Sequence, residues 1–162
     1  MTPSPDDLYI LYTGGTTGMP KGVLWRQADI FLSALGGQDV ELDAMAPAAV
    51  GGGRFLPSPP FMHGAGHWIA LTAMHGGHTI VIQDNTAALD ADDVWTKVER
   101  EKITFLLIVG DAFGRPLLDQ LAKKSYDTSS LLMMLSGGAA LSAAPPLSMN
   151  VSVDRSYSCL AS

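Results

Sequence analysis

The chain has 162 residues, which is enough for one domain with a hydrophobic core. Apolar residues make up 47% and charged residues 16%, a globular composition that excludes a disordered chain. The net charge of −6 disfavours a nucleic-acid-binding surface, and the single cysteine, Cys159, excludes an internal disulfide bond. No signal peptide and no apolar run of membrane-spanning length is apparent, so we expect no integral membrane segment, and a lone cysteine fits a reducing compartment such as a cytoplasmic one.

Apolar periodicity in the first third of the chain predicts two strands and a helix. Residues 8–12 and 19–25 have the β-branched and aromatic content of extended segments. Residues 27–35 repeat apolar side chains at helical spacing, and the glycine pair that follows is a natural helix end. Residues 38–53 lack a pattern and predict a surface loop.

The remaining segments alternate between strand and helix patterns. Residues 54–57 begin an ordered, extended segment, and the predicted strands that follow are 79–82, 103–109 and 131–135. The predicted helices are an apolar one that residues 61–68 lead into and that stops near residues 76–77, and those at 90–102 and 114–124. We expect strand 79–82 to be buried, Lys97 to be solvated, and Pro116 to lie in the first turn of its helix. This alternation predicts an α/β fold with a mostly parallel sheet and flanking helices, in which ligands bind beyond the carboxyl ends of the strands.

A loop rich in glycine and threonine, residues 13–18, separates the first two predicted strands, and Pro20 and Lys21 follow it. Glycines let backbone N–H groups approach a ligand, threonine hydroxyls add donors and acceptors, and a lysine supplies a charge suited to phosphate. Such a nest of donors predicts a polyphosphate site. A flexible hairpin that binds no ligand is the alternative.

Spacing excludes two other phosphate-binding motifs. A Walker A loop requires glycine directly before its lysine and serine or threonine after it, whereas Pro20 and Gly22 occupy these positions. The dinucleotide fingerprint requires Gly-x-Gly-x-x-Gly at the start of a helix, and Gly14, Gly15 and Gly18 do not have that spacing.

Residues 12–23 resemble the phosphate loop of the AMP-forming acyl-CoA synthetases, in the adenylate-forming family that includes luciferases and nonribosomal peptide adenylation domains. The family string is Tyr-Thr-Ser-Gly-Thr-Thr-Gly-x-Pro-Lys-Gly-Val, from which this chain departs by a glycine in place of serine. The resemblance implies ATP, Mg²⁺ and coenzyme A as ligands, with Thr13 contacting magnesium. It implies that the β- and γ-phosphates are held by Thr13, Gly14, Gly15, Thr16, Thr17, Gly18 and Lys21.

Residues 59–66 are similar to a second family motif, in which a histidine lies beside the acyl substrate and the α-phosphate. The resemblance implies that His63 places the carboxylate, as a catalytic residue together with Lys21, and that Trp68 lines an acyl pocket. The alternative is that His63 satisfies a local backbone carbonyl. A metal site built from the four histidines is disfavoured, because Gly64 stands where a zinc protease motif needs glutamate.

Residues 136–141 are similar to the family's Ser-Gly-Gly-Ala-x-Leu segment, whose backbone packs against adenine and ribose. The resemblance therefore implies nucleotide contacts for Gly137, Gly138 and Ala139. Glycine pairs after strands also occur merely for packing.

The resemblance covers residues 8–147, so we expect 1–147 to form part of an AMP-binding domain and 148–162 to form a divergent tail. The family's later Gly-x-Thr-Glu string is absent from the tail. The chain is therefore expected to be a fragment of the N-terminal subdomain of an acyl-CoA synthetase with little activity alone. The implied substrate is a carboxylic acid of fatty or steroid type. A catalytically inactive nucleotide-binding module and a non-functional remnant are the alternatives, and no oligomeric state follows from these residues.

Overall fold

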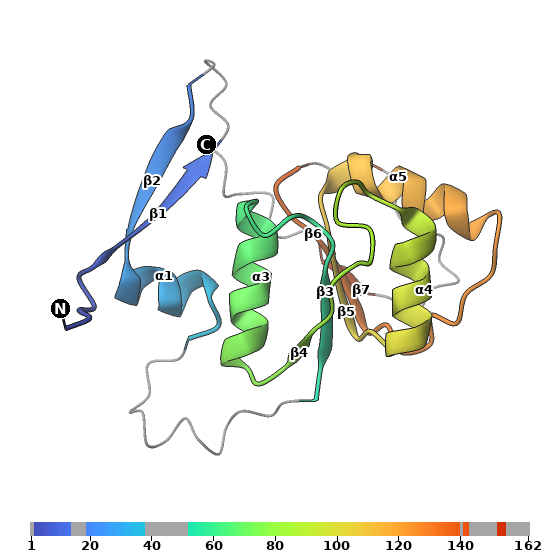
Figure 1. Cartoon of the computed structure of the whole chain (residues 1–162), viewed down its shortest axis with the longest axis horizontal. Coiled ribbons are helices and arrows are strands. Elements are labelled where there is room, and N and C mark those ends of the chain that lie inside the picture. The colour runs from blue at the N-terminus through green and yellow to red at the C-terminus, as the bar shows by residue number, and fades with distance from the viewer. Residues whose placement is uncertain (1, 14–18, 38–51, 140, 143–151, 155–162) are drawn as a thin grey trace.

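A computed structural model of the chain describes residues 2–13, 19–37, 52–139, 141–142 and 152–154. Its N-terminal part is an antiparallel hairpin of β1 (Leu8–Thr13) and β2 (Lys21–Arg26), followed by α1 (Gln27–Ala34). The hairpin projects from the body of the molecule (Figure 1). These elements confirm the predicted strands and helix; the predicted loop 38–53 lies almost wholly outside the described residues.

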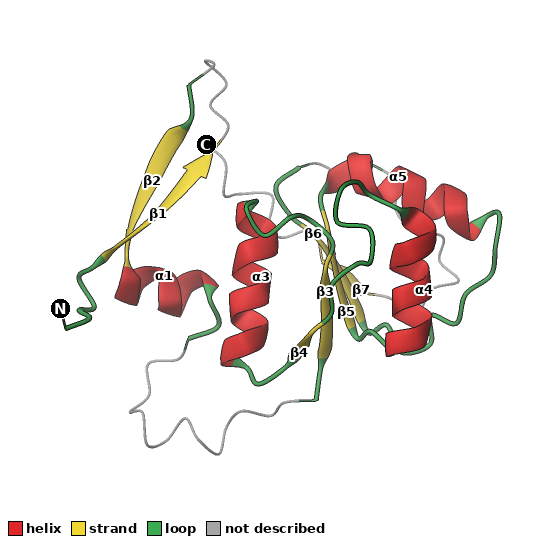
Figure 2. Cartoon of the chain, in the orientation of Figure 1, coloured by secondary structure: helices red, strands yellow, loops and turns green. Residues whose placement is uncertain are grey.

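The body of the protein is a parallel sheet in the order β4-β3-β5-β6-β7. Its elements are β3 (Arg54–Pro57), α3 (Gly64–His75), β4 (Thr79–Ile80), α4 (Ala91–Glu101), β5 (Phe105–Ile108), α5 (Gly110–Leu121), β6 (Met133–Ser136) and β7 (Ser152–Asp154). Helix α3 covers one face of the sheet, and α4 and α5 cover the other (Figure 2). The α/β class and the parallel sheet with flanking helices are thus confirmed.

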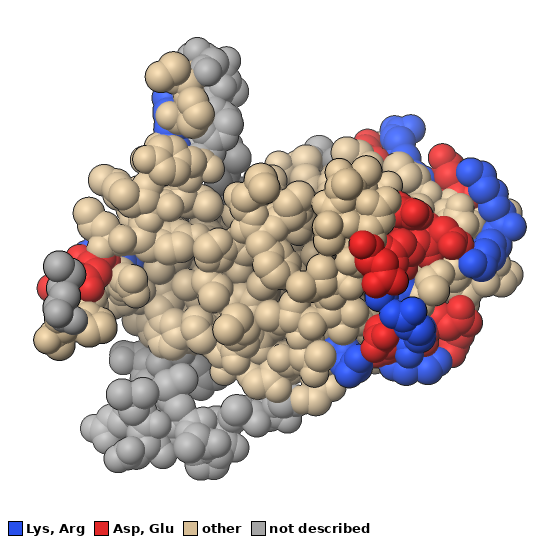
Figure 3. Space-filling view, viewed as in Figure 1, with Lys and Arg blue, Asp and Glu red and all other residues tan. Residues whose placement is uncertain are grey.

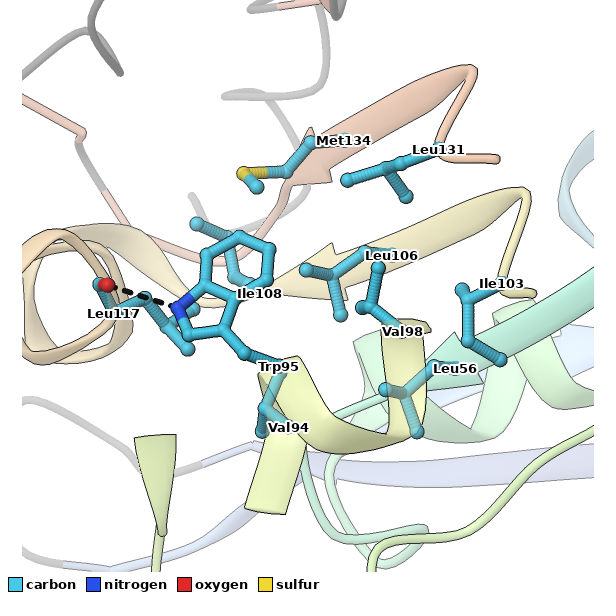
Figure 4. Packing of buried hydrophobic residues seen from close by; sticks show 10 residues of the cluster. All are labelled: Leu56, Val94, Trp95, Val98, Ile103, Leu106, Ile108, Leu117, Leu131 and Met134. Atoms are coloured by element: carbon cyan, nitrogen blue, oxygen red, sulfur yellow. Dashed lines mark hydrogen bonds between the residues drawn. The ribbon is translucent and has the colours of Figure 1, made fainter. Parts of the chain in front are cut away.

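The hydrophobic core lies between the sheet and α4 with α5 (Figure 4). Trp95 of α4 is 1% exposed, and its indole N–H donates to the carbonyl of Leu117 on α5 at 2.9 Å. Leu106 and Ile108 of β5 are buried beneath it. Burying each such side chain contributes about 1.5–3 kcal/mol, so this cluster holds both helices on the sheet.

Helix α4 begins and ends where its sequence predicts. The side chain of Asp90 accepts hydrogen bonds from the backbone N–H groups of Asp92 and Asp93 and so caps the first turn. Lys102 ends the helix in a left-handed conformation, with φ of 50°. One prediction for α4 is wrong: Lys97 is 5% exposed rather than solvated, because its aliphatic stem packs inward while its ammonium pairs with Asp84 at 2.6 Å.

Two other predictions on the elements are wrong. Helix α5 begins at Gly110 rather than at residue 114, so Pro116 lies inside the helix and not in its first turn. Gly110 has φ of 52°, a turn from strand to helix that lets α5 start directly after β5. Strand β4 is short and only partly buried, contrary to the prediction, because β4 forms the edge of the sheet. Ile82, which follows β4, is 56% exposed.

Strand β7 pairs in parallel with β6, and no pattern in the sequence predicted it. Among the helices that the structure describes, none combines the length and the apolar character needed to cross a bilayer.

Candidate functional site

The predicted phosphate loop is carried by the hairpin. Thr13 at the end of β1 pairs with Lys21 at the start of β2, so both residues stand where the loop leaves the hairpin. Gly14, Gly15, Thr16, Thr17 and Gly18, which make up the rest of the predicted phosphate contacts, lie outside the described residues. The structure therefore places the two ends of the loop and not the loop itself.

His63 is the residue that caps the N-terminus of α3. It has extended backbone angles, and its Nδ1 accepts a hydrogen bond from the backbone N–H of Ala65 at 3.3 Å. An accepting Nδ1 assigns the proton of the neutral ring to Nε2. The side chain thus has a local backbone partner, an N–H rather than the carbonyl considered as an alternative, and its second nitrogen remains available for a further contact.

The turn after β6 lies against this histidine. A Cβ built on Gly138 would come within 3.2 Å of Cε1 and 3.8 Å of Nε2 of His63, and Gly138 has φ of +83°. A Cβ on Gly137 would meet Cβ of Ala65 at 3.9 Å. The second and third predicted motifs, far apart in sequence, are therefore in contact, and Ala139 follows in the same turn.

The start of α3 also touches the hairpin. A Cβ on Gly64 would come within 2.8 Å of Cδ2 of Leu11, and the indole N–H of Trp68 donates to the hydroxyl of Tyr9 at 3.1 Å. Trp68 packs edge-on against Trp25 of β2, with ring centroids 6.3 Å apart. The motifs did not predict the contacts of Tyr9 and Leu11 with α3. Two features of the sequence could have indicated them: Tyr9 and Leu11 alternate along one strand face, and Gly64 and Trp68 are four residues apart on one helix face.

The electrostatics of this region favour an anion. The N-terminal end of a helix carries a partial positive charge, and the first turn of α3 contains no acidic residue. Lys21 adds a full positive charge at the end of the hairpin. Acidic and basic side chains gather instead over α4 and the end of α5, whereas the surface around α3 shows few in the view of Figure 3.

The clear pKa shifts among the described residues belong to surface charge clusters away from this region. The pKa of Asp92 is lowered by hydrogen bonds from Lys124 and Tyr126, and that of Asp84 is lowered by the ammonium of Lys97. Burial raises the pKa of Tyr126, with a further contribution from its hydrogen bond to Asp92. These shifts mark structural contacts rather than an acid–base pair at the end of α3.

The four histidines occupy separate environments. His67 packs edge-on against Tyr9, Nδ1 of His75 contacts the carbonyl of Leu35 at 2.6 Å, and His78 stacks on Phe55. Within the described part of the chain, no group of three or more histidine, cysteine or acidic side chains is placed to hold a metal ion.

Comparison with known proteins shows a family match over nearly the whole chain. The family described as "AMP-binding enzyme" matches residues 1–155. The medium-chain acyl-CoA ligase Mig of Mycobacterium avium is 45% identical over 146 residues, which cover 85% of this chain and 26% of that protein. A medium/long-chain-fatty-acid–CoA/3-oxocholest-4-en-26-oate–CoA ligase of Mycobacterium marinum is 42% identical, with 86% of this chain and 26% of that protein covered. The chain thus spans about a quarter of the length of these relatives.

Solved structures show the same fold at lower identity. The N-terminal domain of FACL13 from Mycobacterium tuberculosis superposes with a TM-score of 0.65 and 23% identity, covering 91% of this chain and 36% of that one. The o-succinylbenzoate coenzyme A synthetase of Bacillus subtilis, in complex with ATP and magnesium ion, gives a TM-score of 0.58 and 23% identity, with 80% and 24% covered.

Proposed function

Since this chain belongs to the AMP-binding enzyme family, we propose that it forms the part of an AMP-forming acyl-CoA ligase that holds the phosphates of ATP. The observation that carries the proposal is the meeting of three segments at the start of α3. The hairpin that bears Lys21 packs on Gly64, and the turn at Gly138 packs on His63. Two of the motifs, and the hairpin that carries the third, thus meet at one helix end.

The residues present fit magnesium ATP. Polyphosphate needs cationic and N–H donors, which Lys21 and the start of α3 supply, and Mg²⁺ prefers oxygen ligands such as those of Thr13. At Gly138, a side chain would project against His63, and the glycine keeps the main chain open to a flat base. The glycines and threonines of residues 14–18 complete the proposed phosphate contacts.

Each of these residues has a definite role in the proposed reaction. Lys21 holds the phosphate oxygens by charge-assisted hydrogen bonds. His63, whose Nδ1 is engaged by Ala65, directs its Nε2–H to an oxygen of the carboxylate or the α-phosphate. The turn at Gly137, Gly138 and Ala139 packs against adenine and ribose. Magnesium, when bound, neutralises phosphate charge.

The proposed chemistry is a two-step acyl transfer. A carboxylate oxygen of the acid attacks the α-phosphorus of ATP, and the bond to the bridging oxygen of pyrophosphate breaks. The thiol of coenzyme A then attacks the acyl carbon, and AMP leaves. The relatives are named for medium- and long-chain fatty acids and for 3-oxocholest-4-en-26-oate, so we propose an acid of fatty or steroid type as the substrate.

Calorimetry with magnesium ATP tests the binding role. We expect the native chain and Lys123→Ala, a control at an exposed lysine after α5, to bind alike. Lys21→Ala should bind about ten- to 150-fold more weakly, because a hydrogen bond to a charged group contributes about 1.5–3 kcal/mol. Equal heats for the native chain and Lys21→Ala would contradict the proposal.

Pyrophosphate release separates binding from catalysis. Medium-chain fatty acids and a 3-oxo-steroid acid are added with magnesium ATP, and we expect little or no acid-dependent release from this chain alone. Binding without release supports a nucleotide-binding role without turnover. Robust acid-dependent release would show that residues 1–162 carry the adenylation step.

A further inference from the structure

The inner face of the phosphate-loop hairpin makes two matched contacts with α3. On β1, Tyr9 and Leu11 are two residues apart and point to the same face. On α3, Gly64 and Trp68 are four residues apart and share a helix face. Leu11 lies against Gly64, and Tyr9 accepts the hydrogen bond of Trp68.

These two steps have nearly the same length. Two residues of an antiparallel strand span about 6.8 Å. Four residues of an α-helix span about 6 Å. Both contacts can therefore form at once, in a single register of β1 on α3. In this register β1 runs towards the N-terminus of α3, and Thr13 lies two residues beyond Leu11 in that direction.

We propose that Tyr9, Leu11, Gly64 and Trp68 are positioning residues that fix the register of the hairpin on α3. This register sets how far the Thr13–Lys21 end of the hairpin extends past the start of α3, so the inference rests on the proposed function. A slip of two strand residues would move Lys21 by about 6.8 Å, which is more than a hydrogen bond can span. Phosphate affinity therefore depends on a contact remote from the phosphates.

The hairpin itself supplies little competing restraint, whereas α1, which follows β2 directly, is held on α3 by the hydrogen bond from the hydroxyl of Thr72 to the carbonyl of Ala34. A two-stranded ribbon is marginally stable alone, and the ion pair between Arg26 and Asp6 at its base is exposed. Rings on the inner face reinforce the register, because Trp25 packs edge-on against Trp68 and Tyr9 packs edge-on against His67. The aromatic packing and the lack of a side chain at Gly64 together define one position of β1 on α3.

Disulfide trapping tests the register without nucleotide. Leu11→Cys and Gly64→Cys are combined in a Cys159→Ser background, and oxidation should join them, because Cγ of Leu11 lies 3.7 Å from where a Cβ on Gly64 would stand, close enough for a disulfide bond. The control combines Tyr9→Cys with Gly64→Cys, one strand step out of register, and should stay reduced. Equal trapping of both pairs would overturn the register.

A size swap tests the consequence for binding. Gly64→Leu displaces Leu11 and should weaken magnesium ATP binding by about tenfold, the effect of a free-energy change near 1.4 kcal/mol. Adding Leu11→Ala to Gly64→Leu returns the volume and should restore affinity to within about threefold. A loss of affinity that does not arise from the displacement of Leu11 would not be rescued in this way.

Circular dichroism and the fluorescence of buried Trp95 report whether each variant folds. If Gly64→Leu does not fold, Tyr9→Phe removes the hydrogen bond alone, and we expect about threefold weaker binding. A folded Gly64→Leu or Tyr9→Phe with native affinity overturns the positioning role and leaves the proposed function intact. Absence of ATP binding by the native chain overturns the proposed function, and the positioning role with it.

Discussion

The imidazole of His63 lies directly against the backbone of Gly138, where a Cβ would come within 3.2 Å of Cε1. The two residues belong to different motifs and different strand ends, because His63 follows β3 and Gly138 follows β6. In parallel sheets, the carboxyl ends of neighbouring strands form the ligand edge. This contact is therefore the geometric link between the proposed acyl and adenine sides of the site.

Gly138→Ala should weaken magnesium ATP binding and lower the free energy of unfolding by about 1–3 kcal/mol, the range for a strained left-handed residue. The cause is twofold: φ of +83° is unfavourable for alanine, and the new methyl presses on His63. Gly137→Ala is the matched control for the unfolding measurement, because its methyl would meet Ala65 at an ordinary 3.9 Å, whereas for ATP binding Gly137 is itself a proposed contact. Urea unfolding measures both variants, and calorimetry compares Gly138→Ala with the native chain. Equal losses of stability at the two positions would argue against the contact.

Local patterns predicted most of the elements because each is amphipathic or continuously apolar over its own length. The core strand β5 and the capped helix α4 are of this kind. The start of α5 was misplaced because the apolar run before it continues to residue 109, and only the positive φ of Gly110 separates strand from helix. Lys97 was misplaced because residue type indicates where a charge lies and not where its aliphatic stem packs.

The motifs predicted which residues belong to the site but not which of them are in contact. His63 and Gly138 are 75 residues apart in sequence, and only the parallel pairing of β3, β5 and β6 brings them together. The packing of Leu11 on Gly64 is also a tertiary contact, between residues that are distant in the sequence. In the sequence, Gly64 belongs to the motif that contains His63. In the structure, its lack of a side chain leaves room for Leu11 of the hairpin.

Asp92 should make stability depend on pH in the acid range. Its Oδ1 accepts hydrogen bonds from Lys124 at 2.7 Å and from Tyr126 at 2.5 Å, and these contacts lower its pKa. Because the folded-state pKa lies below the unfolded value of about 3.9, this stabilisation is present above that pH and is lost as the pH falls through the folded value.

Asp92→Asn should therefore flatten the decline of the urea midpoint as the pH falls below about 4. Asp119→Asn, at an exposed carboxylate on α5, is the control and should retain the native slope. Parallel pH profiles for Asp92→Asn and the native chain would rule out this origin.

Lys97 should contribute to stability through its stem more than through its charge. The residue is 5% exposed, whereas its partner Asp84 is 73% exposed at the side chain and stays hydrated when unpaired. Lys97→Met keeps the buried methylenes and should remain near native stability. Lys97→Ala removes them and should lose about 2 kcal/mol of unfolding free energy. Equal losses in both variants would assign the stabilisation to the ion pair instead.

The outer face of the hairpin should promote self-association. Ile10 is paired with Leu24 in the ribbon, they are 47% and 62% exposed, and Tyr12 beside them is 70% exposed. A Cβ on Gly22 would meet Ile10 at 3.1 Å and Tyr12 at 3.6 Å, so these side chains form one apolar patch over the glycine. Contiguous apolar surface on a ribbon with open edges favours association, whereas scattered exposed apolar residues do not.

Ile10→Lys should therefore reduce concentration-dependent association, measured by sedimentation velocity, because a charge in the patch must be desolvated when two surfaces meet. Leu132→Lys is the matched control. Leu132 is 69% exposed and lies in the segment leading into β6 rather than on the hairpin, so we expect association to stay at the native level. An equal reduction by both substitutions would indicate an effect of net charge rather than of the hairpin face, since each adds one positive charge to an acidic chain.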